Sequence, residues 1–449
     1  MTKHHGCMAI RGANEHRAED VELGGRFMRM FDDLPALYTD PAILRDLGDN
    51  KVKENPSDSS LRSTTYPLGM VFFGQFIDHD ITLDVTSELD RTNDPLAIEN
   101  FRTPALDLDS VFGTDAEAFP FLYESSGSHR LILGYHDIDL PRSPDGVALI
   151  GDPRNDENRL ISQLHLAFLK FANAVLDHTG GAFEEAQRLT RWHYQWIVLH
   201  EFLPLTCGEH LVRDILSNGR RFYRPHGDRA FIPIEFAAAA YRYGHSQLPD
   251  FMSINDTSGR VQFFGEELGT GFTPVKKKDQ AVDWRHFFHA GKNPVPQLAQ
   301  RIDTGMAGEL LALPFIADER NNSLATRNLL RGQSFRLPSG QAVADAMGEA
   351  PLTADEVGTG TEIDEATPLW FYILREAELR GQRDGDKGER LGPVGGRIVA
   401  ETLIGLMEYD DNAFLGSDRN WLPELPRADK TTPPSDFSMG DLLAFAKAV

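Results

Sequence analysis

The 449-residue sequence has few cysteines, no long hydrophobic run and a deficit of positive charge. Its two cysteines, Cys7 and Cys207, exclude a disulfide framework and leave a single bridge open. No run of roughly 18 apolar residues occurs, so we expect no membrane-spanning helix. The opening residues MTKHHGCMAIRG lack the apolar core of a secretory signal, so we expect a cytoplasmic or non-classically secreted protein.

The formal net charge is −23, from 45 basic and 68 acidic residues. Nucleic acids and anionic membranes bind basic surfaces, so we expect neither as a partner. The acidic excess is typical of a solvated surface and leaves some capacity to bind cations.

Hydrophobic residues make up 41% of the chain, with 28 phenylalanines, which is enough for a large core. Apolar residues recur at helical spacing over 158–178 and over 183–205, where Pro204 is expected to close the helix. A third such segment, 396–409, follows the sequence GPVGG, which is expected to form a turn.

Strand signals are few and lie at 128–135 and 260–265. The regions 86–148 and 246–322 are rich in Pro, Gly, Asp and Asn, which indicates long ordered loops. We therefore predict a mainly α fold with little β structure. A single large catalytic domain over residues 64–449 is expected to follow an extended N-terminal arm over residues 1–63.

The segment GQFIDHD at 74–80 directly follows the apolar run YPLGMVFF. A helix over 68–79 would place Gln75 and His79 on one face, between phenylalanines. Burying a histidine and a glutamine there costs free energy unless both are hydrogen-bonded. The segment therefore indicates either a catalytic histidine or a satisfied structural one.

Two further segments each allow a chemical role and a structural alternative. Arg154 and Glu157 stand three residues apart in GDPRNDEN, where a helix cap with a local ion pair is the alternative. His245 follows a glycine in YRYGH. A neutral imidazole is a standard iron ligand, although this histidine could equally be structural.

Two more segments carry polar residues at suggestive spacing. Thr103, Asp107 and Asp109 in TPALDLDS offer oxygen atoms that suit a hard cation such as calcium, or they form a generic turn. Asn328 and Arg331 stand three apart in NLLRGQSFRLPSG, which on its own could be any helix ending at LPSG.

Taken in order, these segments resemble the animal-type haem peroxidase (peroxidase–cyclooxygenase) superfamily. The resemblance covers residues 64–416 and rests on GQFIDHD, LDSVFG, GDPRNDEN, EFLP, YRYGH, NLLRGQSFRLPSG and LGPVGGRIVAE. RGQSFR stands where the family commonly has RGRDHG, which is similar to divergent, bacterial members. The resemblance implies a peroxidase (EC 1.11.1 type) with haem b. Hydrogen peroxide would be reduced while phenols, bromide, iodide or thiocyanate are oxidised, in response to oxidative stress.

The resemblance also implies roles on the peroxide side of the haem. His79 matches the distal histidine, with Gln75 as its hydrogen-bonding companion, and Arg154 matches the distal arginine. Asp78 and Glu157 match the carboxylates that form ester bonds to haem methyl groups.

On the opposite side, His245 matches the proximal iron ligand. Asn328 matches the residue that accepts a hydrogen bond from the other nitrogen of that imidazole, and Arg242 and Arg331 match arginines that pair with the haem propionates.

A calcium site is implied as well. Its ligands would be Asp80, Thr103, the carbonyl of Ala105, Asp107 and Asp109, the last standing where the family usually has serine. The additional carboxylate would add negative charge without removing the site.

A fatty-acid oxygenase of the same fold is the alternative function. Such enzymes carry a radical-forming tyrosine three residues before the proximal histidine, where this chain has Arg242. Tyr241 and Tyr243 lie four and two residues before His245, and on a helix this offset turns either ring away. A non-enzymatic haem- or calcium-binding module and a His/Asp metallohydrolase are further alternatives.

Overall fold

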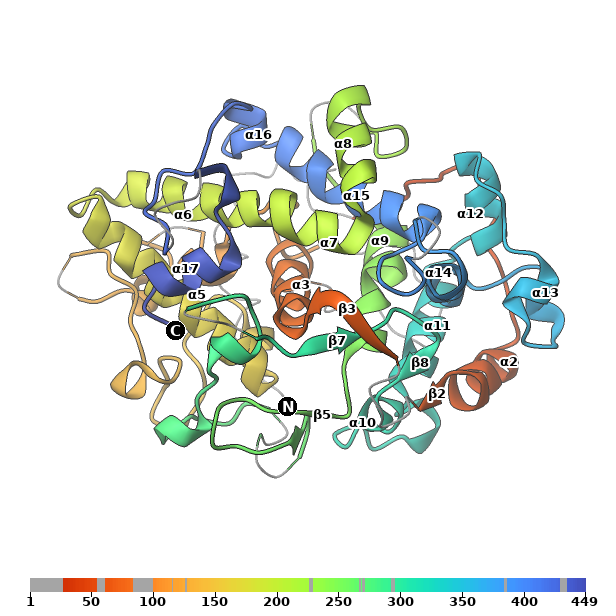
Figure 1. Ribbon diagram of the computed structural model, residues 1–449, viewed down its shortest axis with the longest axis horizontal. Helices are drawn as coiled ribbons and strands as arrows, with labels where there is room; N and C mark the ends of the chain where they lie inside the picture. The colour runs from red at the N-terminus through yellow and green to blue at the C-terminus, as the bar shows by residue number, and fades with distance from the viewer. Residues whose placement is uncertain are drawn as a thin grey trace.

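The computed structural model describes residues 27–54, 61–83, 100–114, 116–125, 127–225, 229–265, 268, 271–291, 295–382, 386–428 and 434–449. About 49% of it is helical and 7% is strand, which confirms the predicted mainly α fold. Helices pack around α3 near the centre, and the few strands are short (Figure 1). No helix in the described part of the chain is long and apolar enough to cross a membrane.

The α-helices are α2 (Pro41–Asp46), α3 (Leu68–Ile81), α4 (Asp109–Phe112), α5 (Arg159–His178), α6 (Phe183–Ile197), α7 (Leu203–Cys207), α8 (Glu209–Asn218), α9 (Ile234–Ala238), α10 (Gly308–Leu311), α11 (Leu324–Ser334), α12 (Gly340–Met347), α13 (Ala354–Val357), α14 (Leu369–Leu379), α15 (Pro393–Glu408), α16 (Phe414–Ser417) and α17 (Met439–Phe445). The π-helical turns are η2 (Leu47–Lys51) and η8 (Val198–Phe202). The 3₁₀ turns are η5 (Pro120–Leu122), η6 (Tyr135–Asp137), η7 (Pro153–Asp156), η9 (Ala240–Gln247), η10 (Lys278–Gln280), η11 (Trp284–His286), η12 (Glu319–Asn321), η13 (Glu362–Asp364) and η14 (Pro434–Asp436).

Helix α3 forms the centre of the core, and the helix expected over 68–79 is confirmed. Its phenylalanines pack against α5 and the turn after α6: the rings of Phe76 and Phe168 stack with centroids 4.3 Å apart, and Phe73 meets Phe202 edge-on at 5.8 Å. Such aromatic contacts bury large apolar areas and fix the rotation of the helix about its axis. The side chains on the remaining face of α3 are therefore held in place.

The long helix expected over 158–178 is confirmed as α5, which Asn158 caps by accepting from the Ile161 N–H. The helix expected to close at Pro204 continues instead, from α6 through η8 into α7, and ends at Cys207. Pro204 is the second residue of α7 and directly follows the π-helical turn η8. Gly208 ends the segment with φ of 87°, a conformation that favours glycine.

The GPVGG segment is not the turn that was expected, because α15 already begins at Pro393. Proline suits the first helical position, since its fixed φ matches the helix and its missing N–H needs no partner there. Gly395 and Gly396 lie inside the helix. A Cβ at Gly395 would come within 2.6 Å of Ile373, so the glycine permits close packing against α14.

The strands in the described part of the chain form two-stranded sheets. Three of these join distant segments: β1 (Phe27–Met28) with β4 (Ile232–Pro233), β2 (Lys53–Glu54) with β8 (Gly305–Met306), and β3 (Arg62–Pro67) with β7 (Leu298–Gln300). The fourth pairs β5 (Phe251–Met252) with the nearby β6 (Val261–Gln262). The strand expected within 260–265 is confirmed as β6. The strand expected over 128–135 is wrong, since only Leu131 makes an isolated bridge there. The side chain of Asn173 on α5 accepts from the Leu131 N–H and donates to the Leu131 carbonyl, at 2.8 Å each.

The described part of the N-terminal arm is more regular than expected, because it contains α2 and η2. The arm is tied to α11 by Asp49, which accepts from the Thr326 hydroxyl at 2.7 Å. The boundary at residue 63 stays a prediction. Cys207 is buried, while Cys7 lies outside the described residues, so the possible bridge between them stays open.

Candidate active site

Helix α3 directs Gln75 and His79 toward the segment that precedes α5. The buried His79 places Nδ1 2.8 Å from Oδ1 of Asn155 and Nε2 3.6 Å from Oε1 of Glu157. Gln75 donates to the same Glu157 oxygen at 2.6 Å and accepts from Asn158 at 3.3 Å. One nitrogen of His79 is therefore anchored, and the other faces a polar surface formed by Gln75 and Glu157.

Arg154 is anchored by Asp152, which caps η7 by accepting from the Arg154 N–H at 2.9 Å. The buried Asp152 carboxylate also accepts from Nε and Nη2 of Arg154, at 3.1 and 2.8 Å, and from Arg102 at 2.7 Å. Burial alone would raise the pKa of Asp152, but the Arg154 and Arg102 guanidinium groups lower it well below its ordinary value. Asp152 is thus a permanent anion that holds both arginines.

The guanidinium of Arg154 also closes the end of α3. Its Nη2 donates to the carbonyl of His79 at 3.0 Å and to the carbonyl of Thr82. These carbonyls lie at the C-terminal end of the helix, where the backbone has unsatisfied acceptors. Arg154 therefore ties the element that carries His79 to the segment that carries Asn155 and Glu157.

His245 lies on η9, an element that packs against α3. Burial, and then the nearby Arg242, lower the pKa of His245 to about 3, so its imidazole is neutral at pH 7. A neutral imidazole is the form that binds a metal. Its Nδ1 lies 3.0 Å from Nδ2 of the buried Asn328 on α11. The nitrogen Nε2 is the one left for a ligand.

The orientation of the Asn328 amide differs from the expected one. In the structure its nitrogen faces His245, while its oxygen accepts from Arg242 at 3.3 Å. An imidazole that binds iron through Nε2 carries its proton on Nδ1 and needs an acceptor there. That arrangement requires the amide to turn, so that Oδ1 faces His245.

A cavity of about 520 Å³, partly open to solvent, is bordered by residues of α3, η7, η9 and α11. Its polar lining is Asp78, Thr82, Arg154, Arg242 and Arg331, and its apolar lining is Phe27, Ile234, Ala237, Ala238 and Phe335. Cofactor sites commonly combine apolar walls with a few charged groups in this way. Three guanidinium groups favour a ligand that is apolar over most of its surface and anionic at one edge. The lining therefore fits haem.

Some of the residues predicted from the sequence line this cavity, and others do not. Asp78 lines the cavity and accepts from the Thr82 hydroxyl at 3.1 Å. Gln75, His79, Glu157 and His245 are not part of the lining. Glu157, expected to reach a haem methyl group, is instead turned toward Gln75 and His79.

The residues expected to bind calcium come together next to α3. Asp80 accepts from the Leu108 N–H at 3.2 Å, Asp107 accepts from the Asp109 N–H at 3.1 Å, and Asp109 accepts from the Thr103 hydroxyl at 3.1 Å. Burial, and then the Asp109 carboxylate, raise the pKa of Asp80 to about 7, and the same two causes raise that of Asp107. Asp80 and Asp107 thus both lie in a buried place where the Asp109 carboxylate disfavours their charged forms.

The loop that carries these carboxylates is fixed to α6. Arg191 donates to the carbonyl of Asp107 at 2.6 Å, and Gln195 donates to the carbonyl of Leu106 at 2.9 Å. Ala105 is buried, and its N–H is bonded to the Thr103 carbonyl at 2.8 Å. The loop geometry is therefore set by protein contacts.

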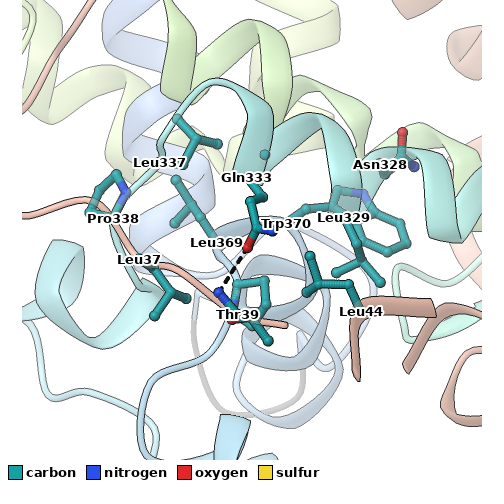
Figure 2. Close-up of a pocket in the computed structure, with 12 residues that line it drawn as sticks. Leu37, Thr39, Leu44, Asn328, Leu329, Gln333, Leu337, Pro338, Leu369 and Trp370 are labelled. Atoms are coloured by element: carbon teal, nitrogen blue, oxygen red, sulfur yellow. Dashed lines mark hydrogen bonds between the residues drawn. The ribbon is translucent and has the colours of Figure 1, made fainter. Parts of the chain in front are cut away.

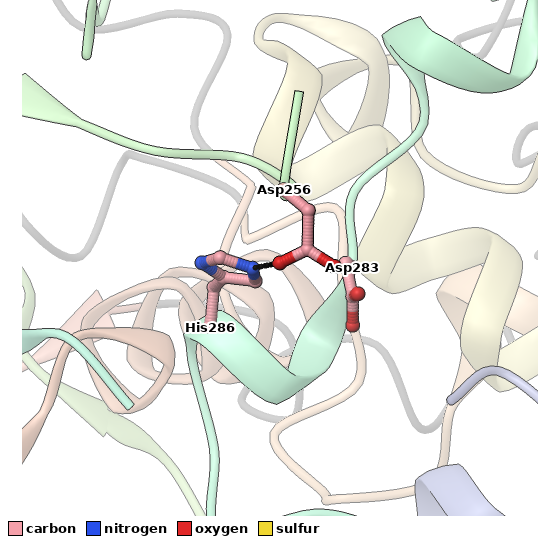
Figure 3. Close-up of side chains that lie close together, drawn as sticks. All are labelled: Asp256, Asp283 and His286. Atoms are coloured by element: carbon pink, nitrogen blue, oxygen red, sulfur yellow. Dashed lines mark hydrogen bonds and ion pairs between the residues drawn. The ribbon is translucent and has the colours of Figure 1, made fainter. Parts of the chain in front are cut away.

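A second group of potential metal ligands, Asp256, Asp283 and His286, lies away from this site (Figure 3). His286 is bonded to Asp256 at 2.9 Å, while Arg285 donates to Asp283 at 2.9 Å and lies 3.5 Å from Asp256. The Arg285 guanidinium thus already pairs with both carboxylates, of which Asp256 is exposed and Asp283 is part-buried. This group has no role in the chemistry described below.

Another cavity, of about 310 Å³, lies between the N-terminal arm and α11 (Figure 2). Leu37 and Leu44 of the arm face Leu329 and Trp370 across it, and the Thr39 N–H donates to Gln333 at 2.8 Å. Its lining contains no titratable side chain. We interpret it as a packing gap behind the helix that carries Asn328.

Sequence reasoning missed four residues that the structure brings to the site: Arg102, Asp152, Asn155 and His165. A capping pattern, Asp before Pro in GDPR, could have indicated Asp152. Nothing in the local sequence indicates the other three, because their partners come from other elements.

The chain is similar in sequence to known peroxidases and oxidases. The family model "Animal haem peroxidase" matches residues 90–350, which is more than half of the chain. The chain is 23% identical to chorion peroxidase of Aedes aegypti over 268 residues, covering 58% of this chain and 32% of that protein. It is 23% identical to dual oxidase of Drosophila melanogaster over 265 residues, covering 52% of this chain and 16% of that protein. The chain thus spans about a third or less of these relatives' length.

Solved structures share the fold. Peroxidase A from Dictyostelium discoideum superposes with a TM-score of 0.60 at 16% identity, covering 87% of this chain and 88% of that one. Fatty acid alpha-dioxygenase from Arabidopsis thaliana superposes with a TM-score of 0.58 at 14% identity, covering 94% of this chain and 75% of that one. At these identities the likeness establishes the fold and leaves the reaction open.

Proposed function

Because the chain belongs to the animal haem peroxidase family, we propose that it binds haem b and reduces hydrogen peroxide while oxidising small electron donors. The observation that carries the proposal is the cavity lined by Arg154, Arg242 and Arg331. Its lining includes Asp78, from the helix that bears His79, and Arg242, from the turn that bears the neutral His245. When bound, haem supplies an iron atom that accepts an oxygen of the peroxide and later takes electrons from the donors.

His245 would hold the iron through Nε2, with Asn328 turned to accept from Nδ1. Arg242 and Arg331 both line the cavity, where they would pair with the two anionic side chains of haem. Arg242 is itself held by the carbonyl of Ala237, at 2.9 Å, so its position is set before the cofactor binds.

His79 and Arg154 would act on the peroxide. The Nε2 atom of His79 accepts the proton of the incoming peroxide and returns it to the leaving oxygen, acting first as base and then as acid. Arg154 is always cationic and stabilises the negative charge that develops as the O–O bond breaks. Asp152 holds the guanidinium in place throughout.

We propose ester bonds from Asp78 and Glu157 to haem methyl groups. Each bond replaces one methyl C–H bond and one carboxyl O–H bond with a C–O bond, and one hydrogen peroxide takes up the two electrons and two protons to become two water molecules. Asp78 lines the cavity, which supports its link directly. Glu157 must first leave Gln75, so its link requires a rotation of the side chain.

We propose that calcium occupies the group formed by Asp80, Thr103, the Ala105 carbonyl, Asp107 and Asp109. The raised pKa values of Asp80 and Asp107 support this proposal, since a divalent cation is the natural counterion for these buried carboxylates. Asp80 adjoins His79 in sequence, so the ion would also stabilise the end of α3.

Phenols and bromide, iodide or thiocyanate are the proposed donors. The dioxygenase neighbour supports the alternative, a haem-dependent fatty-acid oxygenase. The tyrosines beside His245 count against it: Tyr241 stacks on Phe236 with ring centroids 4.4 Å apart, and the Tyr243 hydroxyl lies 3.3 Å from that of Thr206. Both rings are buried in the core around α7 and α9.

Peroxide-dependent oxidation of guaiacol by the haem-loaded protein tests the proposal. The wild type should turn over, and His79→Ala should lower kcat/KM for peroxide by about 10²- to 10⁴-fold. His193→Gln, which changes a buried histidine packed against Trp421 and Phe437 instead, should leave the rate unchanged. Oxygenation of linoleate without added peroxide, combined with no guaiacol turnover, would favour the oxygenase.

A further inference from the structure

A buried chain of three polar side chains extends from the candidate active site into the core. Asn155 lies with Oδ1 2.8 Å from Nδ1 of His79 and with Nδ2 3.0 Å from Nδ1 of His165. Asn155 and His165 are fully buried, and His79 is 5% exposed. The amide thus connects the two imidazoles out of contact with solvent.

Different elements supply the three residues. His79 is on α3, Asn155 is on η7 and His165 is on α5, where its ring lies edge-on to Phe76 with centroids 6.1 Å apart. Asn155 follows Arg154, whose contacts with Asp152 and with α3 fix η7. The amide is therefore held at both ends and along its backbone.

The direction of these hydrogen bonds follows from the chemistry of the groups. Burial lowers the pKa of His165 to about 3, so this imidazole is neutral and can accept through Nδ1. The Asn155 amide nitrogen, which can only donate, faces that atom. The Asn155 oxygen, which can only accept, consequently faces His79, and Nδ1 of His79 must carry the proton.

This arrangement has a consequence for the other nitrogen of His79. With its proton on Nδ1, a neutral imidazole has an unprotonated Nε2. In His79 this atom is on the side of Glu157, where it is available to take a proton. We propose that Asn155, oriented by His165, is a positioning residue that fixes the reactive tautomer of His79. This inference rests on the proposed peroxidase function.

The reversed orientation of the Asn155 amide would give His79 the other tautomer. If Nδ2 of Asn155 faced His79, then Nδ1 would be the acceptor and Nε2 would carry the proton, which blocks its action as a base. An aspartate at position 155 separates the two arrangements, because a carboxylate accepts from His79 in either case. Under the proposed arrangement Asn155→Asp preserves the tautomer, and under the reversed one it creates the reactive tautomer.

The test uses the haem-loaded protein with Asn155→Leu, Asn155→Asp and Asn155→Ser. Two rates are measured: the reduction of peroxide and the association of cyanide. Hydrogen cyanide, like hydrogen peroxide, gives up a proton to a distal base when it binds the iron. We expect Asn155→Leu and Asn155→Ser to lower both rates by about 10²-fold and Asn155→Asp to stay within about tenfold of the wild type. Asn173→Leu is the control, since it removes a buried amide that bonds only Leu131. It should lower the unfolding temperature and leave both rates unchanged.

A double-mutant cycle with His79→Ala separates positioning from general destabilisation. If Asn155 acts through His79, then Asn155→Leu has no further effect on either rate once His79 is removed. An equal loss in both backgrounds, an unchanged rate in Asn155→Leu, or a rate above wild type in Asn155→Asp would each overturn the inference. If the wild type does not bind haem, and if His79→Ala has the same activity as the wild type, the proposed function is overturned instead.

Discussion

The fully buried carboxylate of Asp152 and the part-buried guanidinium of Arg154 form an ion pair two residues apart in the chain, with Nη2 and Oδ2 2.8 Å apart. The same carboxylate holds Arg102 at 2.7 Å, so one anion serves two cations. Arg154 in turn reaches the carbonyls of His79 and Thr82. The position of the proposed distal arginine is thus determined by a residue that does not itself meet the peroxide.

Asp152→Asn should lower both stability and catalysis. Breaking a buried ion pair from one side leaves uncompensated cations and costs about 3–5 kcal/mol. The loss of a fixed guanidinium should lower kcat/KM for peroxide by about 10²- to 10³-fold. Because its folded pKa is depressed, Asp152 stabilises the fold above its ordinary pKa, and this stability is lost as pH falls below that value.

Asp318→Asn is the matched control for this prediction. Asp318 also caps a 3₁₀ turn and pairs with the arginine two residues later, Arg320, but both side chains are exposed. Urea unfolding and steady-state kinetics should show little change in this variant. Equal effects of the two substitutions would contradict the role given to Asp152.

Removal of calcium should destabilise the protein. A cation that binds the folded state alone stabilises it by about 4 kcal/mol at a thousand times its Kd. Addition of EDTA should therefore lower the unfolding temperature, and added calcium should restore it. In Asp107→Asn the response to calcium should weaken, because one carboxylate ligand becomes neutral. The same EDTA effect in Asp107→Asn and wild type would show that the ion is elsewhere.

The proposed ester bonds predict that haem stays with the chain in acidic acetone after the holoprotein has reacted with peroxide. The Asp78→Asn, Glu157→Gln double variant should release it. Since Asp78 lines the cavity and Glu157 does not, Asp78→Asn should weaken attachment more than Glu157→Gln does. Mass spectrometry of haem-bearing peptides measures both, and quantitative release of unmodified haem from the wild type would exclude the links.

Stability should fall as pH rises from 4.5 to about 8 because of Glu376. This buried carboxyl accepts from the Val394 N–H at 3.0 Å, at the start of α15, and burial raises its pKa from 4.5 to about 8. A raised folded pKa gives stability that is complete below the unfolded pKa and is lost as pH rises through the folded one. The change amounts to a few kcal/mol. Glu376→Gln should remove this slope in urea titrations, and an unaltered slope would assign it to other groups.

The sequence predicted the helices that surround the site because their apolar spacing is regular over many turns. It also predicted which face of α3 carries Gln75 and His79, since that follows from helical geometry alone. The ends of elements were harder to predict. Pro204 and GPVGG are usual signals for helix ends or turns. Here Pro204 lies within a helical segment that continues to Cys207, and Pro393 fits the first turn of α15, where proline is tolerated.

The contacts that hold the site together could not be predicted. Asn155 reaches His79 from 76 residues away in sequence, and Arg102 reaches Asp152 from 50 residues away. Such pairs depend on how α3, η7 and α5 pack, which local patterns do not specify. The orientation of Glu157 toward His79 is of the same kind, because it depends on the side chain of Gln75.

The absorption spectrum of the purified protein after addition of haem tests the central claim most directly. The wild type should bind haem stoichiometrically with the Soret band of an imidazole-ligated iron, and His193→Gln should do the same. His245→Ala should lose that spectrum while retaining its fold by circular dichroism. A wild-type spectrum that matches free haem, or one that is unchanged in His245→Ala, would contradict the account.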